Sequence, residues 1–142
     1  MTSKGKKSRF LYKFTVLGPE DILLEKVLSI FDETLVSVDG IRIGSSGVET
    51  DDSDVSAVFM SPRHSALDLL LSLSYTGANG AIIVMREADP AIETVYRNEI
   101  REKIGSGIPT RVVCIGDDVD EFKRTEVAQI LEELIEEIQN SN

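Results

Sequence analysis

The sequence predicts an α/β domain with a doubly wound, mostly parallel sheet that is flanked by helices. One observation is the run Ala81–Met85, which is apolar without alternation, as in a strand covered on both faces. Another is that strand-like and helix-like segments alternate along the chain. With 142 residues, 42% hydrophobic and 28% charged, the chain has the size and composition of one globular domain. We assign residues 1–9 to a basic flexible tail and residues 10–142 to the domain.

The segment Phe10–Leu17 is the predicted first strand, because aromatic and β-branched residues dominate it. Gly18-Pro19 ends this strand, and proline suits the first turn of a helix. The acids of Glu20-Asp21 suit the positive end of a helix dipole. Apolar residues at helical spacing follow as far as Phe31, which predicts an amphipathic helix.

A β-hairpin is predicted next, because Asp39-Gly40 separates the β-prone segments Leu35–Val38 and Ile41–Ile43. The polar and acidic residues 44–54 are predicted to form a solvated loop. Their carboxylates lack the spacing of an EF-hand loop, so we expect no calcium site there.

The third part of the chain begins with a predicted strand at Val55–Met60, which Ser61-Pro62 should break. A leucine-rich helix is expected from Ala66 to Ser74. A glycine-punctuated turn, Tyr75–Gly80, then leads into the central apolar strand.

The C-terminal part is predicted to contain a helix, a strand and a last helix. Asp89 should cap the first of these helices, with Pro90 at its first position and Gly105 as its stop. Residues that share its apolar face are Ile92, Val95, Tyr96, Ile100 and Ile104. The strand Arg111–Ile115 follows. The last helix has apolar residues between 127 and 138 at helical spacing and an opposite face with Glu132, Glu133, Glu136 and Glu137.

Charge is unevenly distributed along the sequence. The net charge is −10, yet residues 1–13 carry bases and no acid. These bases are Lys4, Lys6, Lys7, Arg9 and Lys13. The strongly acidic remainder argues against nucleic-acid binding. The basic tail is either solvated or a contact for an anionic lipid surface or an acidic partner.

Compartment is indicated by the single cysteine and by the hydropathy pattern. Cys114 lies in an apolar run, so we expect an unreactive core thiol, and no internal disulfide is possible. The apolar runs are too short to span a membrane, and the basic start leads into a strand instead of a signal peptide. We expect a cytoplasmic protein without an integral membrane segment.

Three stretches of the chain resemble the Ras/Rab/Arf family of small GTPases. Residues 75–84, Tyr-Thr-Gly-Ala-Asn-Gly-Ala-Ile-Ile-Val, look like the "YRGA-x-G" turn that leads into the family's fourth strand. Lys13–Gly18 is similar to the strand that enters its phosphate loop. Ile108-Pro109, followed by residues 112–120, resembles "IP…LVGNKxD". The resemblance covers about residues 10–122 and implies a P-loop NTPase-like fold that is shortened at its C-terminal end.

The family's phosphate loop, GxxxxGK[ST], is largely lost. Counted from Gly18, Leu23 and Leu24 stand at the positions of the second glycine and the lysine, and Glu25 stands at the hydroxyl position. Lys26 is one residue late. Backbone N–H groups, the lysine and Mg²⁺ neutralise the phosphates in such a site, so we expect tight triphosphate binding to be absent.

The family's other motifs are also eroded. A gapless count places Met60 at the Mg²⁺-contacting aspartate and Arg63 at the glycine of DxxG, with His64 at the water-positioning residue. An exposed or helix-capping role is the alternative for His64, and we favour it because the Mg²⁺ ligands are missing. Thr34 is the remaining candidate for the family's Mg²⁺-binding threonine.

The base-reading motif NKxD is replaced by residues 117–120. Asp120 stands at the guanine-reading aspartate, whereas Asp117 and Asp118 replace the asparagine and lysine. The alternative for Asp120 is a cap of the last helix. We therefore expect Gly18 and Asp120 to be the remaining nucleotide-binding candidates, with no metal site, and GTP or GDP with Mg²⁺ as the sole cofactor candidate.

The resemblance implies a degenerate small-GTPase-like domain, a pseudo-GTPase that acts in regulation or signalling by binding a protein partner. Three expected contact surfaces are the region Met60–Tyr75, the acidic residues 47–54 and the glutamate face of the last helix. One alternative is a divergent GTP- or GDP-binding protein with weak GTPase activity. Another is a homo- or hetero-oligomeric scaffold domain. A receiver-like domain fits less well, because Met60 and Gly116 stand at its phosphoacceptor and lysine positions.

Overall fold

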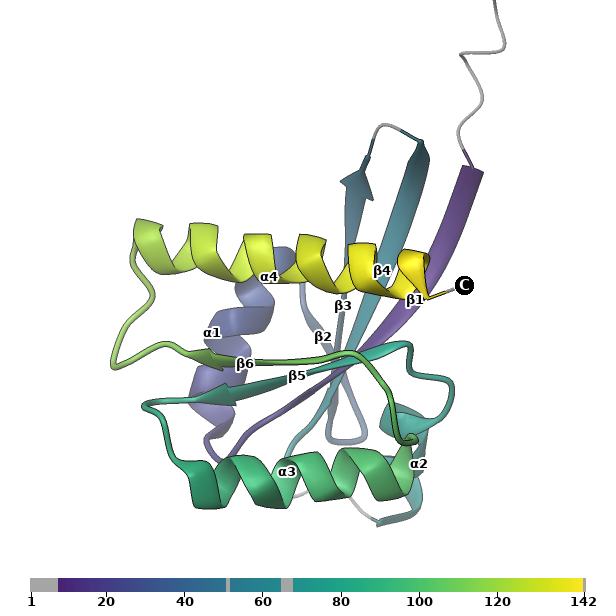
Figure 1. The fold of residues 1–142 in the computed structure, drawn as a ribbon. Coiled ribbons are helices and arrows are strands. Elements are labelled where there is room, and N and C mark those ends of the chain that lie inside the picture. The colour runs from purple at the N-terminus through teal and green to yellow at the C-terminus, as the bar shows by residue number, and fades with distance from the viewer. Residues whose placement is uncertain (1–7, 51, 65–67, 142) are drawn as a thin grey trace, which may run out of the picture.

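The computed structural model describes residues 8–50, 52–64 and 68–141, which form a mixed β-sheet with helices on both faces (Figure 1). The strands, in chain order, are β1 (Ser8–Leu17), β2 (Val36–Val38), β3 (Ile41–Glu49), β4 (Ser53–Pro62), β5 (Gly80–Met85) and β6 (Thr110–Cys114). The helices are α1 (Asp21–Phe31), α2 (Asp68–Tyr75), α3 (Pro90–Lys103) and α4 (Glu121–Asn140). The α/β class predicted from the sequence is therefore confirmed.

The sheet has the strand order β2-β3-β4-β1-β5-β6. Strands β4, β1, β5 and β6 are parallel to one another, whereas β2, β3 and β4 pair antiparallel. The predicted Asp39-Gly40 hairpin is confirmed, with Val38 opposite Ile41. The sheet is therefore mixed: three of its five neighbouring strand pairs are parallel and two are antiparallel, so the predicted mostly parallel sheet is confirmed only in part.

The predicted loop at residues 44–54 is wrong, because most of it lies in two paired strands. β3 runs to Glu49 and pairs with β4 residue by residue, from Ile41 opposite Pro62 to Glu49 opposite Asp54. Ser61 and Pro62, which were predicted to break the strand after Met60, are instead the last two residues of β4. A Cβ at Gly44 would lie 2.7 Å from Leu35 Cδ2, so this glycine lets Leu35 pack closely against β3.

The two faces of the sheet bury separate cores. Helices α1 and α4 cover one face, where residues such as Phe14, Phe59 and Leu134 are fully buried. The other face packs a smaller core with α3 and the end of α2. Every residue of β5 is buried, so the predicted coverage of this strand on both faces is confirmed.

The helices α3 and α4 follow their sequence patterns closely. Asp89 caps α3 by accepting hydrogen bonds from the N–H groups of Ala91 and Ile92, and Pro90 is the first residue of the helix. Val95 was placed on the apolar face, but 64% of it is exposed, so that assignment is wrong. The apolar face of α4 is confirmed, because Val127, Leu131, Leu134, Ile135 and Ile138 are buried.

The turn before β5 is held by contacts to distant segments. Tyr75 is 5% exposed, and its hydroxyl donates to Glu99 on α3 at 2.5 Å. Asn79 exchanges hydrogen bonds with the backbone of Lys13, and Lys13 Nζ donates to the carbonyls of Leu73 and Thr76 at the end of α2. These contacts give Tyr75, Thr76 and Asn79 of this turn a structural role.

The predicted boundary between tail and domain changes, and two predicted segments lie partly outside the described residues. β1 begins at Ser8, so Ser8 and Arg9 belong to the sheet and not to the tail. Residues 1–7 of the predicted tail and Ala66 at the predicted start of α2 are outside the described ranges. Cys114 is a free thiol at the end of β6 and is half-buried, so it is less enclosed than the sequence suggested.

Candidate functional site

The carboxyl ends of β1, β5 and β6 meet at one edge of the sheet, which is where open α/β sheets usually bind ligands. The connections that follow these strands supply the side chains of the candidate site. They begin at Gly18, Arg86 and Ile115, respectively.

The connection from β1 to α1 is too short to form a phosphate loop. Only Gly18, Pro19 and Glu20 separate the strand from the helix. Leu23 and Leu24, which the gapless count placed at the second glycine and the lysine, lie within α1 and are each 1% exposed. The gapless count from Gly18 therefore matched loop positions of the family motif to buried helical positions of this chain. Leu23 and Leu24 pack α1 against the sheet.

Gly18 has a packing role at this edge. A Cβ at Gly18 would lie 2.2 Å from the carbonyl oxygen of Val84 in β5, a backbone atom that cannot turn aside. Glycine lets the end of β1 approach β5 this closely. This contact explains Gly18 without a bound phosphate.

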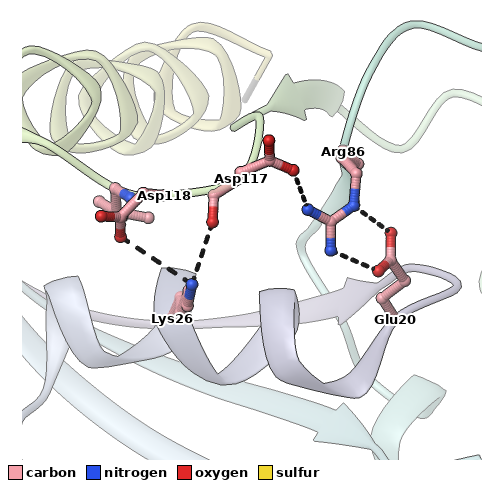
Figure 2. A network of polar contacts seen from close by, with 6 residues as sticks. Glu20, Lys26, Arg86, Asp117 and Asp118 are labelled. Atoms are coloured by element: carbon pink, nitrogen blue, oxygen red, sulfur yellow. Dashed lines mark hydrogen bonds and ion pairs between the residues drawn. The ribbon is translucent and has the colours of Figure 1, made fainter.

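An ion-pair network spans the three connections (Figure 2). The Arg86 guanidinium donates from Nε to Glu20 Oε2 at 3.1 Å and from Nη2 to Glu20 Oε1 at 2.7 Å. Its Nη1 donates to the carboxylate of Asp117. One arginine after β5 thus joins the connection after β1 to the connection after β6.

The electrostatics of this network favour its charged form. The hydrogen bond from Arg86 holds the pKa of Glu20 below its usual value. The bonds to Glu20 and Asp117 raise the pKa of Arg86. Glu20 and Arg86 each keep 40% of their side chain exposed, so solvent screens the attraction and the pair contributes modestly to stability.

Lys26 extends the network along α1. Its Nζ donates to the backbone carbonyl of Asp117 at 3.2 Å and lies 3.9 Å from Asp118 Oδ1. Asp120 accepts a hydrogen bond from the N–H of Lys123 at 2.8 Å and caps α4. The structure therefore places the guanine-reading candidate in a helix cap.

A second charged cluster lies where α1 meets β3 and the end of β4. Arg42 is 1% exposed, and its Nη1 donates to Asp21 Oδ1 at 3.1 Å. His64 Nδ1 lies 3.2 Å from Asp21 Oδ2, and the imidazole is 52% exposed. Burial by itself raises the pKa of Asp21, but hydrogen bonds from His64 and Arg42 leave this pKa below its usual value.

The remaining family-derived candidates are dispersed. Met60 lies within β4 and not after its end, because the strand runs to Pro62. Arg63 contacts Glu25 on α1 at 3.2 Å. Thr34 donates its hydroxyl to Asp32 Oδ1 at 2.7 Å in the turn after α1. Contacts among these residues that would assemble a Mg²⁺ site are not present in the part of the chain that the structure describes.

Sequence reasoning missed the two central arginines. Arg86 follows β5 directly, so its position at the carboxyl end of a central strand was the available signal. Arg42 stands between Ile41 and Ile43, and alternation along a strand places it on the face opposite to both isoleucines, so the local pattern did not indicate its burial. Its partner Asp21 is 21 residues away. In neither case did a local motif indicate the partner.

A cavity lies beside the ion-pair network, and it is open to solvent. Its volume is about 400 Å³, and it is lined by Glu25, Lys26 and Asp118, among others. Within residues 8–50, 52–64 and 68–141, groups of three or more His, Cys, Asp or Glu side chains arranged to hold a metal ion were not found. In the same ranges, none of the helices is long and apolar enough to cross a membrane.

Comparison with known proteins adds no assignment. The models of known protein families do not match this chain, and the curated proteins give no significant match.

Proposed function

We propose that this chain is a small-GTPase-like domain that does not use a nucleotide and acts as a protein-binding regulatory module. The observation that carries the proposal is the Glu20–Arg86–Asp117 network at the carboxyl ends of β1, β5 and β6. In the proposed fold family this edge is the nucleotide site, and here the chain fills it with its own charges.

The charges at this edge oppose a polyphosphate. Glu20 and Asp21 place two carboxylates at the N-terminus of α1, where a phosphate would otherwise accept hydrogen bonds from backbone N–H groups. Arg86 is held by Glu20 in a two-bond fork of the kind that arginine also forms with phosphate. A nucleotide would therefore have to displace Glu20 before it could use Arg86.

The likeness to small GTPases is supported by the order of elements and by the turn before β5. The antiparallel β3–β4 pair followed by parallel β4, β1, β5 and β6 is compatible with that fold. Residues 117–120 follow the last strand at the position of the family's base-reading motif. Helix α4 follows Asp120 directly, without a further strand between them.

Titration with fluorescent GDP and GTP analogues, with and without Mg²⁺, tests the nucleotide part of the proposal. We expect no saturable binding. Binding with a Kd below about 10 μM, a binding free energy of roughly 7 kcal/mol, would refute this part of the proposal.

The variants Asp120→Ala and Asp89→Ala form a matched pair, because each removes one helix cap and only Asp120 is a base-reading candidate. Binding that is lost in Asp120→Ala alone would establish the divergent GTP-binding alternative.

Crosslinking in a native extract tests the binding-module part. We expect the wild-type chain to recover a defined protein. A double variant, Glu132→Lys with Glu136→Lys, should lose that protein, because it reverses charge on the exposed face of α4. Glu102→Lys, on the exposed surface of α3, is the control and should retain it. Recovery of no specific protein in repeated screens would count against the module.

A further inference from the structure

Two acidic segments that are far apart in the sequence line one groove. The groove lies between α4 and the turn that joins β3 to β4, and its volume is about 680 Å³. Figure 1 shows α4 crossing the sheet so that its C-terminal end reaches β1 and β4. Gln139 on α4 lines the groove and donates to Ser53 Oγ at 3.1 Å. The carboxylates that line it are Glu49, Asp52, Glu132, Glu133 and Glu136.

Most of these carboxylates have no basic partner among residues 8–50, 52–64 and 68–141. Arg111 on β6 pairs with Glu137 at 2.8 Å and with Glu133 at 3.7 Å, on the side of α4 that faces β6. The other four groove acids make no ion pair with the residues that the structure describes. The groove therefore carries an uncompensated negative charge that favours a cationic ligand.

A second cavity continues the groove toward the start of β1. Its volume is about 260 Å³, and it shares Asp52 and Gln139 with the acidic groove. Tyr12 lines this cavity and is 6% exposed, and its buried hydroxyl has no hydrogen-bond partner within the part of the chain that the structure describes. A buried hydroxyl without a partner is costly, and a polar group entering the cavity would satisfy it.

The basic N-terminal segment starts at the mouth of this second cavity. Ser8 lines the cavity, and its N–H donates to the carbonyl of Asp52 at 3.3 Å. The seven residues before Ser8 include Lys4, Lys6 and Lys7 and contain no acid. Four extended residues span about 13 Å. The helical distance from Glu132 to Gln139 is about 10 Å, so an extended segment from Ser8 to Lys4 is long enough to run along the groove.

We propose that the acidic groove between α4 and the β3–β4 turn is the docking site for the basic N-terminal segment, residues 1–7, of the same chain. The unpaired carboxylates attract its lysines, and the covalent link at Ser8 keeps the segment at a high local concentration. The Tyr12 cavity accepts a polar group of the docked segment. Docking covers the glutamate face of α4, so the segment would compete with the protein partner that the proposed function places on that face.

Carbodiimide crosslinking of the dilute full-length chain, followed by peptide mapping, tests this proposal. The reagent joins lysine amines to carboxylates that are in contact. We expect bonds from Lys4, Lys6 or Lys7 to groove acids in monomeric protein at low salt. The yield should fall steeply at about 0.5 M salt, where the Debye length is roughly 4 Å.

Matched glutamate variants separate the groove from the general acidity of the protein. The double variant Glu132→Gln with Glu136→Gln should lower the yield by about fivefold, as expected from losing two exposed charge pairs. The control double variant Glu87→Gln with Glu102→Gln removes two exposed acids elsewhere and should leave the yield unchanged. Crosslinks that spread over all exposed acids, with equal yields in both variants, would overturn the proposal.

A second measurement uses the full chain without crosslinking. Replacing all three lysines, Lys4, Lys6 and Lys7, by glutamine should shift the backbone amide resonances of residues 132–139 and leave those of α3 in place. Unchanged resonances on α4 would overturn the proposal. Crosslinks that form only between two chains and increase with concentration would also overturn it, and would assign the groove to the segment of a second copy.

Discussion

Replacing Gly18 by alanine is the sharpest test of how the central edge is built. The added Cβ would lie 2.2 Å from the Val84 carbonyl oxygen and 3.3 Å from Leu24 Cδ2. The first distance is about 1 Å shorter than a van der Waals contact, and the atom it meets is backbone in a fully buried strand. Relief requires β1 and β5 to separate at their last paired residues, Leu17 and Ile83.

We expect Gly18→Ala to destabilise the fold by about 3 kcal/mol, at the upper end of the usual cost of overpacking a core. For a domain of this size that is a fall in Tm of roughly 6–12 °C. Gly47→Ala is the matched control, because a Cβ at Gly47 in β3 has no atom within 4 Å. The control should stay within about 0.5–1 kcal/mol of wild type, on the stabilising side.

Urea denaturation followed by circular dichroism measures both variants, and each is repeated with GDP and Mg²⁺. A free energy of unfolding of Gly18→Ala within about 0.5 kcal/mol of wild type, the range of neutral surface substitutions, would refute the close-packing role of Gly18. An equal loss of free energy in both glycine variants would refute it as well. A stabilising effect of GDP on wild type that Gly18→Ala abolishes would instead return Gly18 to a phosphate-binding role.

Two further predictions concern a charged cluster and a helix cap. Asp21→Asn should cost about 1–2 kcal/mol at pH 7, because it leaves buried Arg42 without its carboxylate, and the exposure of Asp21 limits the loss. The pKa of Asp21 is depressed in the folded state, so this carboxylate stabilises the fold above about pH 4, and the stabilisation is lost as pH falls through the folded pKa. The urea midpoint of Asp21→Asn should therefore fall less steeply than that of wild type between about pH 5 and pH 2. Asp89→Ala removes two hydrogen bonds at the start of α3 and should cost about 1 kcal/mol in the same assay, whereas Glu87→Ala, just outside the helix, should cost nothing measurable.

Most elements of the fold follow from local sequence patterns. Asp39-Gly40 specified a two-residue hairpin, and Asp89-Pro90 specified the start of a helix, because each pair acts on the backbone conformation of its immediate neighbours. The pattern failed at residues 44–49, where glycines and serines are typical of a turn. There the long β4 partner supplies backbone hydrogen bonds, and tertiary pairing overrides the weak local preference for a loop.

The candidate site was predictable in location but not in content. Once the strands are predicted, the rule that open α/β sheets bind ligands at the carboxyl ends of their strands indicates the junctions after β1, β5 and β6. The contacts within the site join residues that are 66 and 31 positions apart, Glu20 with Arg86 and Arg86 with Asp117. No periodic or local signal links residues at such separations. Counting motif positions from Gly18 also failed, because it could not show that α1 begins at Asp21.

The proposed absence of nucleotide binding depends on geometry more than on missing motif residues. A lost lysine could be replaced from elsewhere in the chain, and both Lys26 and Arg86 lie at this edge. Each is already directed to an internal acceptor, Lys26 to the Asp117 carbonyl and Arg86 to the Glu20 carboxylate. The connection of three residues leaves the backbone no length with which to surround a phosphate. Restoring a lysine at position 24 would therefore bury a charge under α1 and would not create a phosphate site.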